Sequence, residues 1–433
     1  MKEKEMKSKM LPCIIAIMVI AAIGGLVACQ KRAPEEITKE DVESYFQDAS
    51  RSDVKDIISN TVPQDVISEV ATQPRNITVA IMHFSTIAGT TWSGAHDAAL
   101  KRLDNLYPWL NYVFEEEIGP EESCPVGEDL IATKGANIVI GNASFMGEPL
   151  IDIADDYPDV YFGTVIESTA DRDRNFIRFF PRQYQGFYLA GLVAGAITKT
   201  NKIGMVSAFP CIQVNRRCAG FYLGVKDANP KATLYIKYAG GWYDPPTEAE
   251  IARTLIDQYD CDVLTSQTDS SAPVEIASEE EIWFIGKDMD LVGLGWSDEN
   301  TVAISFDTRW EVIYEKIIKD YMAGDEYPDN LIFVGMEDKM FLKDEEVPVV
   351  DIVNNQVRGV DGISSKALPL ISKSTLGLIE EKRGLMLAGK WDPFLKELKD
   401  QTGTVKKEAD VMPTDEWLLT ELDFDLYGVK VLK

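Results

Sequence analysis

From Ile77 onward, short and continuous apolar runs alternate with segments of helical period. Strands that are apolar along their whole length are typical of a parallel sheet covered by helices on both faces, so the pattern predicts an α/β fold. The series holds more strands than one doubly wound sheet usually contains, and we therefore expect two sheets, each in its own lobe. The predicted strands cover 77–84, 138–140, 160–162, 176–180, 202–206, 233–238, 262–265, 283–285 and 302–306.

The series of strands is interrupted near Pro181 and resumes at Lys202. After about residue 335 the alternation weakens, and we expect the remaining chain to form helices and excursions that close back over the lobes. The predicted boundaries place 77–182 and about 290–330 in lobe 1, and 183–289 with parts of about 331–433 in lobe 2.

The N-terminus has the features of an export signal. Four lysines precede an apolar run from Leu11 to Val27, and this order is typical of a secretory signal peptide. The ending Leu26-Val27-Ala28-Cys29 is typical of a bacterial lipobox, in which the cysteine is lipidated and becomes the first mature residue. The alternative is a single transmembrane anchor, for which about 17 apolar residues are the lower limit.

We therefore expect residues 1–28 to be removed and Cys29 to carry the lipid. Stable anchoring needs more than one acyl chain, such as palmitate. The polar stretch 29–75 is predicted to be a partly helical tether. The mature protein would then be held at the cell membrane, facing the periplasm or the cell exterior, and the sequence leaves open which membrane holds it.

Charge and composition exclude several classes of function. A net charge of −28 argues against nucleic acid as a partner. The chain has two histidines, His83 and His96, which argues against a histidine-based metal site and against a serine triad. We expect no metal and no cofactor. The sequence leaves open whether Cys211 and Cys218 form a disulfide.

Ligands of open parallel sheets bind in the crevice outside the carboxyl ends of the strands. The loops at these ends carry aromatic rings at Trp92, Phe209 and Trp242, and carboxylates at Asp269 and Asp288. Rings stack on flat heteroaromatic molecules, at about 1–3 kcal/mol per base in nucleic-acid readers, and carboxylates accept from ring N–H and exocyclic groups. The loops therefore indicate a flat heteroaromatic ligand, although each ring taken singly could equally be packing.

Other chemistry is less well supported. The carboxylates in 286–290 could form a metal site or the acid/base pair of a nucleosidase, but no neighbouring residue supplies a second chemical role. We therefore expect a binding protein with no catalytic residues. Gly191 and Gly195 are interpreted as close helix packing, because no glycine-rich phosphate loop opens a helix after the first strand.

An ordered series of motifs resembles the basic membrane protein family of ABC-transporter substrate-binding lipoproteins. The resemblance spans roughly 77–325 and implies a type I periplasmic-binding fold, in which three hinge crossovers join two lobes that close on a ligand. It also implies a purine base or nucleoside as ligand, and an ABC permease and ATPase as partners. The motifs are Trp92-Ser93-Gly94-Ala95-His96-Asp97, 185–204, Phe209-Pro210, Asn229-Pro230, Trp242-Tyr243-Asp244-Pro245, Thr268-Asp269-Ser270 and 285–290.

The resemblance implies roles for the residues at the strand ends. Trp92 corresponds to one stacking ring, and Phe209 or Trp242 to the other. Asp269 and Asp288 correspond to the polar groups that read the ligand.

The sequence departs from the nucleoside-binding members of the family. Those members have an acidic residue near Gly89 and a lysine near Thr308. Their loss, together with Trp310 in the late segment, favours a free purine base over a nucleoside. Lys287 also replaces an apolar or tyrosyl residue and is expected to adjust specificity.

Two non-enzymatic functions remain open at this point. The first is the receptor of an importer, and the second is a sensory or surface-interaction lipoprotein that keeps the fold without transport. An ATPase and permeases encoded beside the gene would favour the first. The sequence does not determine which purine binds or the oligomeric state.

Overall fold

The computed structural model describes residues 76–165, 175–324, 331–352 and 362–433. The predicted signal peptide, the lipidation site Cys29 and the tether lie outside these residues. None of the helices in the described ranges combines the length and the apolar character that a membrane span requires.

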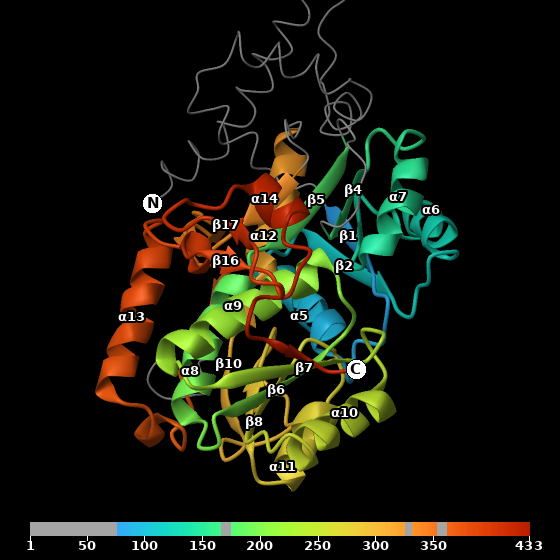
Figure 1. Cartoon of the computed structure of the whole chain (residues 1–433). Helices are drawn as coiled ribbons and strands as arrows, with labels where there is room; N and C mark the ends of the chain where they lie inside the picture. The colour runs from blue at the N-terminus through green and yellow to red at the C-terminus, as the bar shows by residue number, and fades with distance from the viewer. Residues whose placement is uncertain (1–75, 166–174, 325–330, 353–361) are drawn as a thin grey trace, which may run out of the picture. The chain divides into compact units, whose positions relative to one another are not determined.

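The first lobe is a six-stranded parallel sheet with helices on both faces (Figure 1). Its elements are β1 (Ile77–Met82), α5 (Thr91–Leu106), β2 (Leu110–Glu115), α6 (Ser123–Lys134), β3 (Ile138–Gly141), α7 (Gly147–Ala154), β4 (Tyr161–Val165), β5 (Phe176–Pro181), α12 (Trp310–Ala323) and β12 (Leu331–Val334). The strand order is β12-β5-β4-β3-β1-β2. Every residue of β1 is buried, as expected for a central strand between two helical layers. Leu130 of α6 and Leu150 of α7 cluster with Met82 on one face, while α5 and α12 pack together on the other.

The second lobe repeats this architecture. Its elements are α8 (Tyr184–Ile197), β6 (Lys202–Ser207), α9 (Ile212–Ala228), β7 (Thr233–Tyr238), α10 (Pro245–Asp257), β8 (Val263–Ser266), α11 (Ala272–Glu279), β9 (Trp283–Gly286), β10 (Val302–Ser305) and β18 (Lys430–Val431). The strand order is β10-β9-β8-β6-β7-β18, with all neighbours parallel. Leu255 of α10 and Val274 of α11 pack with Leu264 on one face. The prediction of two doubly wound parallel-sheet lobes is confirmed.

The chain passes between the two sheets three times within the described residues. It leaves the first sheet after β5, returns after β10, and leaves again after β12. The short strands β11 (Asp307–Thr308) and β15 (Val350–Asp351) lie on two of these passages and pair with each other in antiparallel register. This pairing ties two of the crossovers together.

The strand pairing differs from the expected lobe boundaries in one respect. Val302–Ser305 was expected in lobe 1, but it pairs with β9 in the second sheet. Leu331–Val334 was expected beyond lobe 1, but it pairs with β5 in the first sheet. The alternation of strands and helices along the sequence could not predict which sheet each strand joins, because each is a short apolar run that fits the edge of either sheet.

The close packing of helices α8 and α9 depends on glycine. A Cβ atom at Gly191 would fall inside van der Waals distance of the Phe221 carbonyl oxygen, and one at Gly224 would clash with the Tyr188 carbonyl oxygen. Glycine therefore lets the two backbones approach. The interpretation of Gly191 and Gly195 as packing residues agrees with this geometry, since a Cβ at Gly195 would lie 2.7 Å from the Val225 carbonyl oxygen.

The C-terminal part of the chain packs against the second lobe. Arg216 of α9 donates to the Leu418 carbonyl oxygen at 2.8 Å, and the Tyr184 hydroxyl donates to Asp392 at 2.7 Å. The chain then adds β18 to the edge of the second sheet beside β7. The elements of this part are β13 (Phe341–Leu342), β14 (Glu345–Glu346), α13 (Lys373–Leu387), β16 (Leu398–Lys399), β17 (Val405–Lys407) and α14 (Asp415–Thr420).

Candidate functional site

Lys287 lies at the centre of a buried polar contact between the two lobes. Its Nζ atom is 2.9 Å from Asp269 Oδ1, 2.7 Å from Asp288 Oδ2 and 3.0 Å from Thr91 Oγ1. Asp269 follows β8, Lys287 and Asp288 follow β9, and Thr91 begins α5 after β1. These positions are the carboxyl ends of the strands, where parallel sheets bind ligands. The structure therefore brings together the two carboxylates that the sequence singled out.

The charges in this contact are taken out of water together. Burial raises the pKa of Asp269 above its usual value, and the Lys287 ammonium opposes that shift. Burial alone would lower the pKa of Lys287, but the carboxylates of Asp269 and Asp288 together raise it. Lys287 thus keeps its proton, and it balances the charge that the aspartates bring into the interior.

Three further side chains complete the contact. Gln183 Nε2 donates to Asp288 Oδ1 at 2.7 Å and to Thr308 Oγ1 at 2.8 Å, and its Oε1 accepts from Arg217. Gln183 and Thr308 lie on crossovers, so a change in the angle between the lobes would alter these bonds. Asp288 has a backbone φ of 63°, which is strained for any residue other than glycine. Strained backbone conformations of this kind cluster at functional sites.

Trp92 packs in the first turn of α5, close to this contact. Its Nε1 donates to the Asn142 carbonyl oxygen at 2.7 Å. One near neighbour is the stacked ring of Phe180, at a centroid distance of 6.0 Å, and another is the Arg217 guanidinium at 5.6 Å. Trp92 is 7% exposed. In this conformation the Arg217 guanidinium lies against its indole, and little of the ring is left to solvent.

Phe209 and Trp242 lie on neighbouring loops of the second lobe. Their ring centroids are 5.2 Å apart in an edge-to-face arrangement, and both side chains are half-buried. The Trp242 carbonyl oxygen accepts from the Asp269 backbone N–H at 3.0 Å, which places this aromatic pair next to the polar contact. The two rings contact each other in this conformation.

Trp310 is placed differently from the other predicted residues. It is fully buried in the first lobe, where it stacks on His96 at 4.0 Å and meets Trp92 and Phe179 edge to face. Aromatic packing encloses the Trp310 ring in this conformation, and its predicted ligand contact stays a prediction. The sequence shows an aromatic residue at this point but not which way α12 turns it.

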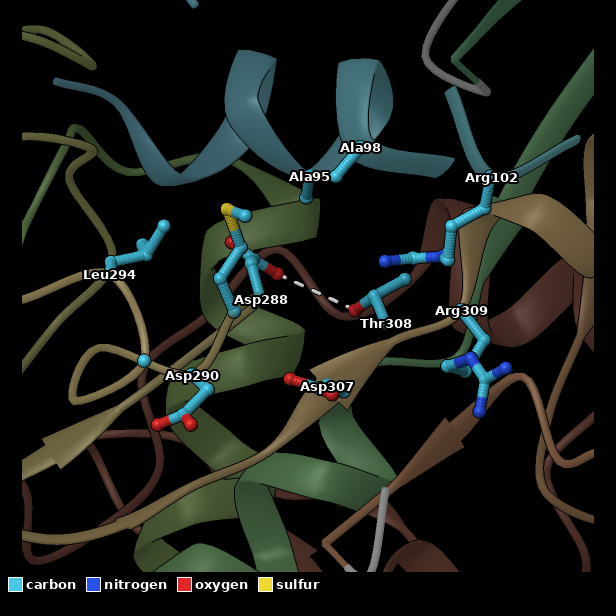
Figure 2. Close-up of a pocket in the computed structure, with 11 residues that line it drawn as sticks. Ala95, Ala98, Arg102, Asp288, Asp290, Leu294, Asp307, Thr308 and Arg309 are labelled. Atoms are coloured by element: carbon cyan, nitrogen blue, oxygen red, sulfur yellow. Dashed lines mark hydrogen bonds between the residues drawn. The ribbon is translucent and has the colours of Figure 1, made fainter. Parts of the chain in front are cut away.

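A cavity of about 260 Å³ adjoins the polar contact on the side of the crossovers. Figure 2 shows residues of α5 along one side of it and the acidic and basic side chains of the crossover and of the loop after β9 along the other. A second cavity of about 10 Å³, beside Thr91 and Lys287, holds no more than one water. The larger cavity is lined by Ala95, Ala98, Arg102, Asp288, Met289, Asp290, Gly293, Leu294, Asp307, Thr308 and Arg309.

The arrangement suits binding by charge-assisted hydrogen bonds. Burial lowers the pKa of His83 to about 3 and that of His96 well below its usual value, so both imidazoles are neutral. In the described part of the chain, no group of three or more side chains is arranged to hold a metal ion. No disulfide joins Cys211 and Cys218, whose pairing the sequence left open.

The sequence did not single out Gln183, Arg217 or Asp307 as site residues. Gln183 stands at the point where the strands change lobes, which is a usable signal, since crossovers line the crevice of such folds. Arg217 lies in the middle of a helical segment, where arginine is usually exposed, and its burial at 2% exposure gives no sign in the sequence.

Residues 76–366 match the model of a family described as ABC transporter substrate-binding protein, PnrA-like. The chain belongs to this family. The family consists of solute-binding proteins, in agreement with two lobes that enclose polar groups at their strand ends. The resemblance drawn from the sequence motifs is confirmed.

Relatives in this family differ in the ligand that their names state. The chain is 33% identical over 287 residues to a protein of Haloferax volcanii named for glucose binding in an ABC transporter, with 66% of this chain and 71% of the relative covered. It is 24% identical over 371 residues to a purine-binding protein of Brucella abortus, with 85% and 97% covered.

Solved structures of ABC-transporter solute-binding proteins share the fold. The protein from Aeropyrum pernix superimposes with a TM-score of 0.58 at 19% identity and covers 81% of this chain and 100% of its own. The protein from Conexibacter woesei gives 0.54 at 19% identity, with 73% and 98% covered. These likenesses support the type I periplasmic-binding fold.

Proposed function

We propose that the substrate-binding protein captures a purine, with a free base favoured over a nucleoside, between its lobes and delivers it to an ABC permease and ATPase. The observation that carries the proposal is the contact of Asp269 and Asp288 with Lys287 and Thr91 across the lobes. Its carboxylates can accept from ring N–H and amino groups, and Lys287, whose three donors are engaged in this conformation, can donate to a ring nitrogen or carbonyl oxygen that replaces one of its partners.

The preference for a base over a nucleoside rests on two positions. Gly89, with a φ of +91°, has no side chain that could reach a ribose. Thr308 offers a hydroxyl already bonded to Gln183 at 2.8 Å. A lysine there would have supplied a charged donor.

Calorimetry on the purified chain with adenine, guanine, hypoxanthine and their nucleosides tests the proposal. We expect saturable binding of at least one base, tighter than that of its nucleoside. Asp269→Asn should weaken it about tenfold or more, because a charge-assisted hydrogen bond contributes about 1.5–3 kcal/mol. No binding of any purine would refute the assignment.

A second ligand class has specific support. The Lys287 donor lies between two acceptors, the carboxylates of Asp269 and Asp288. Neighbouring hydroxyl groups of a sugar match this order, because each hydroxyl both donates and accepts hydrogen bonds. The Haloferax relative is named for glucose binding. A hexose is therefore the alternative, and glucose belongs in the same calorimetric series. Binding of glucose with no response to purines would select it.

The proposal includes the anchor at Cys29. The lipobox pattern Leu26-Val27-Ala28-Cys29 supports acylation at that cysteine and attachment to the membrane outside the cytoplasm. Cys29→Ser should move the protein from the membrane fraction to the soluble fraction, and mass spectrometry should show acyl groups on the wild-type N-terminus. A sensory or surface role without transport is the remaining alternative, and it predicts unchanged ligand uptake in cells that lack the protein.

A further inference from the structure

The charges around the 260 Å³ cavity are only partly compensated by one another. Glu311 is fully buried, and it pairs with Arg102 at 2.8 Å and with Arg309 at 2.5 Å. Lys287 is shared between Asp269 and Asp288. Arg102 and Arg309, which line the cavity, and the neighbouring Lys287 are thus already engaged with carboxylates.

Asp307 is a carboxylate of the cavity wall with one unsatisfied oxygen atom. It lies in β11 on a crossover between the lobes, and its Oδ1 atom is buried and accepts no hydrogen bond within the described residues. Figure 2 shows it on the side of the cavity opposite α5, between Asp290 and Arg309. A buried acceptor without a donor costs free energy comparable to a lost hydrogen bond, and more when it is charged.

The pKa of Asp307 agrees with a carboxyl group that lacks a hydrogen-bond donor. Burial raises its pKa to about 7, Arg309 and Arg102 lower it, and Asp290 and Glu311 raise it. On the paired strand β15, Asp351 faces Arg383 at 2.8 Å and is therefore engaged elsewhere. A ligand group that carries hydrogen-bond donors, and above all one with a positive charge, would satisfy the carboxylate.

The remaining wall of the cavity fits a compact molecule. Ala95 and Ala98 present small side chains from α5, and Met289 and Leu294 add apolar surface from the loop after β9. Asp288 and Thr308 border the cavity and also belong to the polar contact between the lobes. The cavity is therefore continuous with the proposed ligand site.

We propose that this cavity is the subsite for an amino-bearing group of the ligand, with the Asp307 carboxylate as its acceptor. The inference rests on the proposed capture of a small molecule between the lobes, and it narrows the ligand to one that presents an exocyclic amino group or a protonated amine at this position. An aminopurine is thereby preferred to an oxopurine.

Calorimetry with two matched pairs at neutral pH tests the subsite. Adenine and hypoxanthine differ by an amino group in place of a carbonyl oxygen, and glucosamine and glucose differ by an amine in place of a hydroxyl. We expect the amino member of the pair that binds to be preferred about tenfold or more. Asp307→Asn should reduce that preference severalfold. The charge-matched control Asp257→Asn, on the exposed end of α10, should leave it unchanged.

The outcomes separate this inference from the ligand class. Equal affinity for adenine and hypoxanthine, or a preference for adenine that survives Asp307→Asn, overturns the subsite and leaves purine capture standing. Preference for glucosamine over glucose, without purine binding, supports the subsite and overturns the purine assignment. If neither pair binds, both proposals are wrong. The comparison within the wild type does not depend on the folding of any variant.

Discussion

The Nζ atom of Lys287 lies 3.0 Å from the Oγ1 atom of Thr91, so that a buried side chain of the second lobe donates to the first helix of the other. The loop after β8 meets the same helix start through the backbone, where Thr91 N–H donates to the Asp269 carbonyl oxygen at 3.1 Å. This conformation is therefore closed at the strand ends. Lys287 contributes to the closure because it satisfies two carboxylates at once.

Replacing Lys287 with methionine should destabilise the protein strongly. The change keeps a long apolar side chain but leaves Asp269 and Asp288 buried without a counter-charge, and breaking a buried pair typically costs about 3–5 kcal/mol. Urea unfolding measures the difference. The control is Lys202→Met, which removes the exposed pair with Asp260 and should cost less than about 1 kcal/mol. Similar losses in both variants would show that Lys287 is not part of a tightly coupled contact.

Trp92 and Trp310 share one aromatic cluster but should differ in their effect on ligand binding. Each change to alanine should cost about 3–5 kcal/mol of stability, because both rings are buried. Trp92→Ala should also weaken ligand binding at least tenfold, through loss of stacking by a ligand that displaces the Arg217 guanidinium from the indole, whereas Trp310→Ala should leave the dissociation constant nearly unchanged at a temperature where it stays folded. An equal loss of affinity in Trp310→Ala would restore that residue to the ligand contacts, as the sequence predicted.

The aromatic pair Phe209 and Trp242 offers a test that stability does not dominate. Both rings are half-buried at loop tips, so Phe209→Ala and Trp242→Ala should lower ligand affinity more than they lower the melting temperature. Calorimetry and thermal unfolding on the same samples measure the two effects. A fall in melting temperature with unchanged affinity would mean that the pair only packs.

Asp307 should make stability depend on pH in a defined direction. An aspartate has a pKa of about 3.9 when unfolded, and in the folded protein it is raised to about 7. Between these values the folded state holds a proton that the unfolded state has released, so stability falls as pH rises from about 4 to about 7. Asp307→Asn lacks this titration and should gain stability relative to wild type across that window. Unfolding at a series of pH values checks it, and a difference independent of pH would contradict the burial of this carboxyl.

Replacing glycine with alanine should have opposite effects between α8 and α9 and on the exposed surface of α13. Gly224→Ala should cost about 1–3 kcal/mol, because the new Cβ meets the Tyr188 carbonyl oxygen and the helices must separate. Gly377→Ala, in the exposed middle of α13 with nothing within 4 Å, should instead stabilise by about 0.5–1 kcal/mol. Chemical denaturation of both variants measures the contrast, and equal shifts would rule out the steric reason.

Much of the architecture could be predicted from the sequence because buried parallel strands are continuous apolar runs. The runs at Ile77–Met82 and Ile138–Gly141 are examples. Strand β2, by contrast, is largely exposed along Leu110–Glu115 and was not predicted. Strand β18 is two exposed residues, and only its pairing with β7 defines it.

The candidate site was predictable where a loop follows a strand and not where a helix or crossover turns a side chain inward. Asp269 and Asp288 follow strands, and the structure brings them to one lysine. Arg217 and Asp307 depend on how α9 and β11 are oriented between the lobes, and Trp310 turns into the core for the same reason. Contacts between segments far apart in the sequence set these orientations. The residue types and spacing within one segment therefore do not predict them.

The most direct test of the account is calorimetric titration of the purified protein with adenine, alongside glucose and adenosine. The account predicts saturable binding of adenine at one site per chain, tighter than that of adenosine, and weakened about tenfold or more in Asp269→Asn. Heats that do not saturate for any purine, with saturable binding of glucose, would contradict it.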